Sequence, residues 1–308
     1  MFALWAPMAA GTVAPVVRVA SWNVYWAALD DVHGRSAIVD TIDGAGPLDF
    51  MAVIEAEGDT PSGALASWTG KSRSLSAMRS LITISRYESL AIFYDDSKWT
   101  PGQVVPGAFD AGRPFLLAEF SLRAQPNTTV WVFGVHLPHF LDTEVDPGTI
   151  MAGVLRNASS TRPANVILAG DWNEFQWEDN PCPAPAYPPD CRAQAARRMS
   201  ALWDLYFAGD ARDTVPSHSI SCCTKWAPAD RGTTSYTEWR FEYDHIFATG
   251  GLVGGPAVEL PYAYPGVAQP CSDAACTGEN PPANVTALYQ GSWHRGWKLE
   301  LSLSPLSR

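Results

Sequence analysis

Short runs of apolar residues, many of them alternating with polar ones, recur along the whole chain. They are rich in β-branched and aromatic residues and end at glycine, proline, asparagine or aspartate, a pattern that is typical of β-strands. The pattern predicts strands at residues 16–24, 50–55, 80–85, 89–94, 115–122, 129–136, 164–169, 243–249 and 297–303.

Two segments carry apolar residues at helical spacing instead. Residues 35–42 place Ile38 and Ile42 one turn apart, and residues 192–207 form a longer amphipathic pattern that stops at Gly209. Many strands with few helices predict an α/β (α+β) fold of four layers. In this fold two packed mixed β-sheets are flanked by helices.

The chain has 308 residues, enough for one large domain or two small ones. No internal repeat, linker or charge block divides it, so we expect a single domain over residues 1–308. Residues 1–15 are expected to be either a leader or an N-terminal extension. Residues 251–290 are rich in proline and glycine and are expected to form one long loop.

The formal net charge of −11 limits the choice of partners. Proteins that bind nucleic acid tightly carry basic patches, and the densest basic stretches here are only Lys71–Arg73 and Arg197–Arg198. We therefore expect no stable non-specific binding to nucleic acid. An enzyme that contacts a phosphate only transiently, through a metal ion, remains compatible with this charge. No stretch reaches the roughly 18–20 apolar residues of a transmembrane helix, and we expect a monomer.

Six cysteines lie in segments rich in proline or serine. Two close pairs, Cys182 with Cys191 and Cys271 with Cys276, predict small loops closed by disulfides. A zinc site would need a C-x-x-C pair or nearby histidines, which these segments lack. Three glycosylation sequons also fit a secreted chain, at Asn127, Asn157 and Asn284. We expect secretion, although residues 1–17 lack the positively charged start of a signal peptide.

Polar side chains stand at or near the ends of several predicted strands, where a plain core strand needs none. They are Asn23, Glu55, His136, Asp171, Asn173, Asp244 and, ahead of the last strand, His294. Each one alone is compatible with an ordinary turn or a solvated sheet edge. Together they predict convergence on one rim of a sheet, where such folds often build sites. Asp171 and Asn173 are two apart, so in an extended segment their side chains would point the same way.

Carboxylate and asparagine oxygens without cysteine form a hard donor set. This set suits Mg²⁺, Mn²⁺ or Ca²⁺ better than zinc. Two histidines and further carboxylates beside such a cation suit phosphate-ester hydrolysis. The cation neutralises a phosphate oxygen, a base takes a proton from water, and imidazolium groups stabilise the developing charge.

Seven short segments in chain order resemble motifs of the endonuclease/exonuclease/phosphatase superfamily, which has the DNase I-like fold. The resemblance spans about residues 16–303. The resemblance is specific because the segments follow one another in the family's order, although Ile54 stands where the family usually has a glutamine. The segments are SWN, DFMAVIEAE, YESLAIFYDD, GVHLPH, GDWN, YDHIF and SWHRG.

The resemblance implies a metal site. Glu55 would be the principal metal ligand, with Asn23 beside it. Asp171 and Asn173 would position the attacking water and a phosphate oxygen. Mg²⁺ is the expected metal, with Mn²⁺ or Ca²⁺ as alternatives.

The resemblance also implies two histidine pairs. His294, oriented by Asp244, would act as general base or phosphate contact, and His136, paired with Glu88, would do the complementary work on the leaving side. We expect the last strand to lie beside the strand of Asp244, which would bring His294 within hydrogen-bonding distance of that carboxylate.

The chain departs from the family pattern at two positions. Trp293 stands where the family usually has an aspartate that helps to hold the metal, and tryptophan cannot bind a hard cation. Glu57 stands near the place where secreted double-strand nucleases of the family carry an arginine. Tryptophans beside the motifs, such as Trp172, are expected either to pack in the core or to stack against substrate.

These observations lead to one leading hypothesis and two alternatives. We expect a metal-dependent phosphoesterase that hydrolyses a phosphate ester, preferably a phosphodiester of small or lipid-like character, by attack of water. The first alternative is a nuclease acting on DNA or RNA. The second is a catalytically weakened or inactive binding protein on the same fold, which Trp293 favours.

Overall fold

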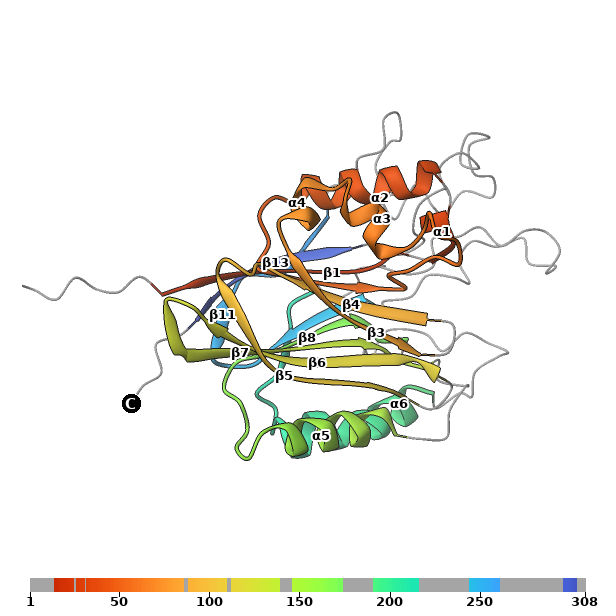
Figure 1. The fold of residues 1–308 in the computed structure, drawn as a ribbon. Helices are drawn as coiled ribbons and strands as arrows, with labels where there is room; N and C mark the ends of the chain where they lie inside the picture. The colour runs from red at the N-terminus through yellow and green to blue at the C-terminus, as the bar shows by residue number, and fades with distance from the viewer. Residues whose placement is uncertain are drawn as a thin grey trace, which may run out of the picture.

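The computed structural model of the chain describes residues 14–24, 26–30, 32–85, 88–109, 112–138, 146–173, 191–215, 244–260 and 296–303. Two β-sheets are stacked face to face, and helices cover the outer face of each (Figure 1). The layers therefore run helix, sheet, sheet, helix, and the predicted fold class is confirmed.

The first sheet, sheet A, has seven strands in the order β11-β13-β1-β2-β4-β3, with β12 also paired to β13. Strands β1 and β2 are parallel, and the other pairs are antiparallel. Its strands are β1 (Val16–Asn23), β2 (Phe50–Ile54), β3 (Arg79–Ser85), β4 (Glu88–Tyr94), β11 (Leu252–Gly254), β12 (Val258–Glu259) and β13 (Trp297–Leu303).

The second sheet, sheet B, has six strands in the order β5-β6-β7-β8-β10-β9. Here β7 and β8 are parallel, so both sheets are mixed. Its strands are β5 (Trp99–Ala108), β6 (Pro114–Leu122), β7 (Gln125–His136), β8 (Val166–Asp171), β9 (Arg212–Asp213) and β10 (Asp244–Ala248).

Helices on the side of sheet A are α1 (Trp26–Asp30), α2 (Val32–Gly44), α3 (Leu65–Thr69) and α4 (Arg73–Ser76), and those on the side of sheet B are α5 (Pro147–Ala158) and α6 (Cys191–Ser200). The Asp146 side chain caps α5 by accepting a hydrogen bond from the Thr149 backbone N–H. Residues 192–207 were predicted as one helix, but the α-helix ends at Ser200 and continues as a π-helical segment, Ala201–Tyr206. No helix in the described ranges is long and apolar enough to span a bilayer.

The main core lies between the two sheets. Phe50 of β2 contacts Trp99 of β5 and Phe120 of β6, with ring centroids 5.0 and 4.8 Å apart. A second cluster lies between sheet A and its helices, and a third lies between sheet B and its helices. Strand β2 is therefore buried on both faces, which explains why its sequence is apolar without alternation.

The nine predicted strands all exist, and four others were missed. Strand β5 was missed because Pro101 and Pro106 interrupt its pattern, which an edge strand tolerates. Strands β11 and β12 occupy the start of residues 251–290, so the expected long loop begins with sheet structure.

The last strand and the strand of Asp244 lie next to each other but in different sheets. Strand β13 contacts β10 from the facing sheet and does not pair with it. It pairs with β1 in sheet A, while β10 pairs with β8 and β9 in sheet B. The chain changes sheets in the short turn between Ala248 and Leu252, which the sequence did not indicate.

Candidate functional site

Three polar residues form a row across sheet B. His136 is opposite Asp171 in the parallel pair β7–β8, and Asp171 is opposite Asp244 in the antiparallel pair β8–β10. Residues opposite one another on adjacent strands point to the same face of the sheet. All three are buried, and His136 Nε2 lies 3.5 Å from Asp171 Oδ2.

Gly170 allows this row to be compact. A Cβ atom at Gly170 would overlap the carbonyl oxygen of Val135 on β7. Glycine is therefore required immediately before Asp171, where any side chain would collide with the neighbouring strand.

A second row lies at the facing edge of sheet A. Asn23 ends β1, Glu55 directly follows β2, and Glu88 begins β4. Because β1 and β2 are parallel and β4 is antiparallel to β2, these three positions meet at one end of the sheet. Ser89 extends the contact between β4 and the end of β2, since its carbonyl accepts a hydrogen bond of 3.3 Å from the Ala56 N–H.

Asn23 joins the two rows. Its side-chain Nδ2 donates to Glu55 Oε1 at 3.1 Å and to Asp171 Oδ2 at 2.9 Å. Glu55 Oε2 accepts a further hydrogen bond of 3.1 Å from the Trp26 backbone N–H. The side chains at the ends of both sheets thus form one cluster.

Two residues of this cluster have a strained backbone. Glu55 and Asn173 have φ angles of 56° and 44°, in the left-handed region that L-residues rarely adopt. Asparagine tolerates that region well, whereas glutamate does so at a cost of about 1–3 kcal/mol. Such strain is typical of functional sites, because tertiary contacts must hold the residue in place.

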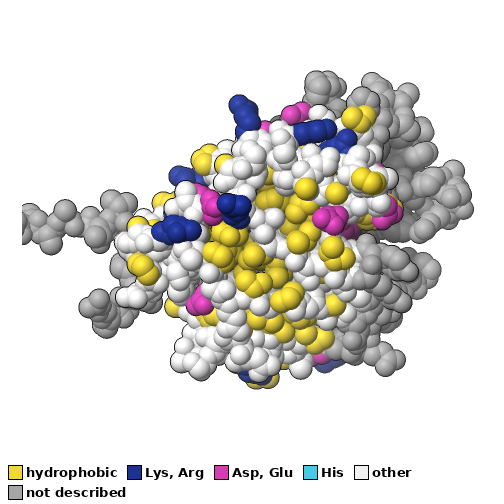
Figure 2. Space-filling view, viewed as in Figure 1, with side chains coloured by type: hydrophobic (Ala, Val, Ile, Leu, Met, Phe, Trp, Pro, Cys, Tyr) yellow, Lys and Arg dark blue, Asp and Glu magenta, His cyan; other side chains and the backbone are white. Residues whose placement is uncertain are grey.

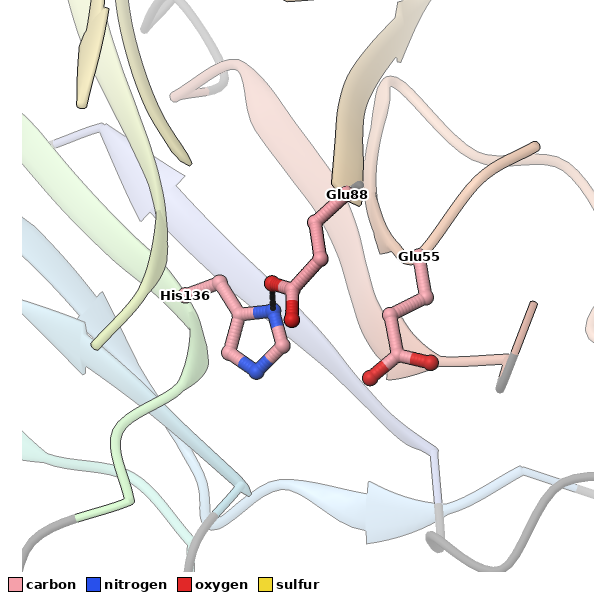
Figure 3. A group of neighbouring side chains, drawn as sticks. All are labelled: Glu55, Glu88 and His136. Carbon is pink, nitrogen blue, oxygen red and sulfur yellow. Dashed lines mark ion pairs between the residues drawn. The ribbon is translucent and has the colours of Figure 1, made fainter. Parts of the chain in front are cut away.

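His136 lies between Glu88 and Arg113, a residue of the connection from β5 to β6 (Figure 3 shows the histidine with Glu88 and Glu55). His136 Nδ1 is 2.8 Å from Glu88 Oε2, and Arg113 Nη1 is 2.6 Å from Glu88 Oε1. Arg113 Nη1 also contacts His136 Nε2. In the tautomer protonated at Nδ1, the histidine donates to Glu88 and its Nε2 accepts from Arg113.

The Glu88 carboxyl has a lowered pKa. Burial by itself would raise this pKa, but the hydrogen bond and electrostatic attraction from His136, together with the charge and hydrogen bond of Arg113, outweigh burial and hold the pKa below its ordinary value of 4.5. Glu88 is therefore ionised at neutral pH, and its carboxylate fixes the orientation of the imidazole.

The donor set fits a hard divalent cation. One ligand atom each from Glu55, Glu88 and His136 lies within 4.8 Å of the others. The carboxylates of Glu55, Glu88, Asp171 and Asp244 converge in this part of the molecule, and Arg113 forms an ion pair with Glu88. Carboxylate oxygens are the ligands that hard divalent cations prefer. Since both Glu88 oxygens already contact His136 and Arg113, Glu55 is the better ligand, with Asn23 beside it.

No family model matches the sequence, and no curated protein matches it. Solved structures do match its fold. An endonuclease/exonuclease/phosphatase family protein from Bacteroides thetaiotaomicron has a TM-score of 0.61 at 16% identity, over 94% of this chain and 99% of that one. D. rerio TDP2, complexed with single-strand DNA product, has a TM-score of 0.57 at 14% identity, over 93% and 99%. ANGEL2, described as a 2',3'-cyclic phosphatase, has a TM-score of 0.57 at 12% identity, over 94% and 96%.

The chain has the DNase I-like fold of the endonuclease/exonuclease/phosphatase superfamily. The expected resemblance is therefore confirmed at the level of fold. At these sequence identities the likeness says nothing of this chain's own substrate.

On this fold, six of the eight predicted site residues lie directly in the cluster or in contact with it. They are Asn23, Glu55, Glu88, His136, Asp171 and Asn173. Asp244 is opposite Asp171 and fully buried. His294 and its neighbour Trp293 lie outside the described residues, as do Cys182, Cys271 and Cys276.

The expected geometry of Asp171 and Asn173 was wrong. The segment is not extended, because Asn173 is left-handed and its backbone N–H donates to Asp171 Oδ1 at 3.1 Å. Asn173 Nδ2 donates to the Leu137 carbonyl at 3.0 Å. Trp172, between them, is fully buried and stacks on Trp203 with ring centroids 5.5 Å apart, so it packs in the core.

Arg113 is the site residue that sequence reasoning missed. It lies in the connection between β5 and β6, in the segment GRPF at residues 112–115. Its side chain is only 18% exposed. The one available signal was an arginine directly before a predicted strand. Because β5 itself was missed, nothing indicated that this arginine lies near the end of β7.

Proposed function

We propose that this protein is a metal-dependent phosphoesterase that hydrolyses phosphodiesters by attack of water. The observation that carries the proposal is the meeting of two polar rows, one from each sheet, with Asn23 bonded to both Glu55 and Asp171. A purely structural rim would not need two buried and two partly buried carboxylates at the junction of the two sheets. The DNase I-like fold supports the same reaction class, since its solved relatives include a 2',3'-cyclic phosphatase and a protein complexed with DNA product.

A divalent cation would be held by Glu55, with Asn23 beside it, and Mg²⁺ is the first candidate because all of these donors are hard oxygens. Such a cation would supply charge neutralisation at a phosphate oxygen. The hydrogen bonds from Asn23 Nδ2 and the Trp26 N–H orient the Glu55 carboxylate toward this task.

Asp171 would accept the proton of the attacking water. Its carboxylate is buried and receives hydrogen bonds from Asn23 and from the Asn173 N–H, which hold it in one orientation. Asp244, its neighbour on β10, would orient His294. A base held in place by neighbouring groups loses little entropy when it reacts.

His136 and Arg113 would contact the phosphate on the leaving side. Glu88 is paired with Nδ1 of the imidazole and Arg113 contacts Nε2, so a phosphate bound by the Arg113 guanidinium would lie beside the imidazole. The guanidinium of Arg113 offers several donors in one plane, which is the geometry that a phosphate accepts.

The acidic character of the chain favours a small or lipid-like phosphodiester over long duplex DNA. Glu57 and Asp59 follow Glu55 closely in the chain, and the net charge is −11. Both would repel a polyanion. A nuclease remains the second candidate, because one solved relative is complexed with single-strand DNA.

We also propose that the protein is secreted. Asn127, in β7, and Asn157, near the end of α5, are exposed sequon residues and so could accept a glycan. The close cysteine pairs support the same compartment.

The test is a substrate panel with purified protein: bis-p-nitrophenyl phosphate, a nucleoside 2',3'-cyclic phosphate, sphingomyelin, single-stranded DNA and supercoiled plasmid, each with Mg²⁺, Mn²⁺, Ca²⁺ or EDTA. The proposal expects cation-dependent turnover of a small or lipid phosphodiester, lost in Asp171→Asn and kept in Glu300→Gln, an exposed control on β13. Preferred cleavage of DNA would favour the nuclease. No turnover of any substrate with any cation would overturn the enzyme proposal.

A further inference from the structure

The four edge strands of the two sheets differ in how well they are protected against pairing with another chain. In sheet B, β9 has only two residues, and β5 contains Pro101, Pro106 and a bulge. In sheet A, β11 has only three residues. Short strands, prolines and bulges are the usual means by which an edge avoids pairing with another chain.

Strand β3, at the other end of sheet A, has none of these features. It has seven residues, and the stretch from Ser80 to Ser85 contains neither charge nor proline. Ile82 is 39% exposed and Ile84 is 63% exposed. Figure 2 shows hydrophobic side chains gathered on the face of the molecule along which β3 runs.

The outer face of β3 carries both a projection and a groove. Leu81 packs toward the core between the sheets, so Ser80, Ile82 and Ile84 point outward. Ser80 lines an open groove together with Leu75, Met78 and Phe93. The exposed Ile84 therefore lies four residues from a groove of mixed polar and apolar lining, which also includes Thr69 and Ser76, on the same face of the same strand.

We propose that β3 pairs antiparallel with β3 of a second copy of this chain, with the two Ile82 residues opposite each other at the two-fold axis. In this register Ile84 of each copy is opposite Ser80 of the other and enters its groove. Each copy thus supplies one projection and one groove, which is the self-complementarity that a two-fold interface requires. The pairing also satisfies the backbone N–H and C=O groups along the edge of β3 that pairs with no strand in the described residues.

The charges agree with this register. Arg79, which is paired with Asp96 at 2.9 Å, would lie opposite Ser85 of the second copy, so the two arginines would be at opposite ends of the interface. A dimer differs from the monomer that the sequence suggested, since the sequence alone does not indicate which strand is an edge.

The first experiment is sedimentation velocity of the full chain at roughly 1–100 µM, the range in which small interfaces dissociate. We expect wild type to reach the dimer mass, twice 33.4 kDa. Ile82→Lys/Ile84→Lys should weaken the dimer at least about tenfold. The matched control is Val253→Lys/Val258→Lys, which adds the same charge at the opposite end of sheet A. These two valines are 53% and 52% exposed, and the control variant should dimerise as wild type does.

The second experiment tests the register. Ile82→Cys should form an intermolecular disulfide between the two introduced residues, identified by peptide mapping, whereas Val253→Cys should not. Circular dichroism must show that each variant is folded. If the lysine variant fails to fold, Ile84→Thr replaces it, and a weakened dimer is still expected. A wild type that stays monomeric at 100 µM, a lysine variant that dimerises normally, or binding of monomers to lipid vesicles through Ile84 would each overturn the proposal.

Discussion

Glu88→Gln is the sharpest single test of the site, because it removes one charge and keeps the size of the side chain. The wild-type carboxylate binds His136 at 2.8 Å and Arg113 at 2.6 Å, and its side chain is 21% exposed. Hydrogen bonds to charged groups each contribute about 1.5–3 kcal/mol. Glutamine keeps one acceptor oxygen but turns its amide N–H₂ group toward the second donor, so about one of the two contacts is lost.

We therefore expect the free energy of unfolding to fall by about 2–3 kcal/mol, and Tm to fall by about 5 °C or more. Turnover should fall about 10²-fold, because His136 loses the partner that fixes its tautomer. KM should change less than kcat, since the phosphate contacts of Arg113 remain. Thermal melting and steady-state kinetics measure both effects, and Glu300→Gln, which breaks the exposed pair with Arg18, is the matched control and should change neither.

The stability difference between wild type and Glu88→Gln should depend on pH. The pKa of Glu88 is lowered in the folded protein, so its ionisation stabilises the fold above the unfolded value of about 4.5 and this stabilisation is lost as pH falls through the lower folded pKa. The difference in Tm should therefore be full at neutral pH and should shrink below about pH 4.5. Equal Tm and equal turnover at pH 7 would refute the assignment of Glu88 as the residue that positions His136.

Three other predictions concern the rest of the site and the cysteines. Glu55→Gln and Asp171→Asn should each lower turnover at least about 10²-fold in steady-state assays, and near-normal rates would mean that the metal face lies elsewhere. Trp293→Asp should tighten Mg²⁺ binding, measured by calorimetry, and keep or raise turnover; unchanged affinity would show that this position does not face the metal. Peptide mapping of the non-reduced protein should find Cys182 joined to Cys191, which would stabilise the fold by about 2–3 kcal/mol, whereas free thiols at both positions would contradict the pairing.

Asp171 lies on the predicted rim of the sheet but is closed off from solvent. Its side chain is only 2% exposed and accepts hydrogen bonds from Asn23 and from the Asn173 N–H. Asp171→Asn should therefore affect stability as well as turnover, because the new amide N–H₂ group would face the Nδ2 donor of Asn23. Comparing its Tm with that of Glu300→Gln separates this effect from the loss of catalysis.

Nine of the thirteen strands in the described residues could be predicted from the local sequence. Residues 50–54 are apolar throughout because both faces of the strand are covered. This pattern can be recognised in the sequence of that one segment. The polar residues at strand ends were equally visible, because a carboxylate after a buried run contradicts simple core packing. Local information was sufficient for these features, since each depends on the periodicity of one segment.

Only the tertiary structure decided how the segments meet. The assignment of β13 to sheet A, the turn at Asn173 and the contact of Arg113 with Glu88 all join residues through space. Strand β5 escaped prediction because a proline is tolerated only where the N–H faces no neighbour, and a sequence does not state which strands are edges. Local periodicity fixes which residues are buried, but pairing depends on which sheet buries the most apolar surface without leaving polar groups unpaired, and that is a property of the whole chain.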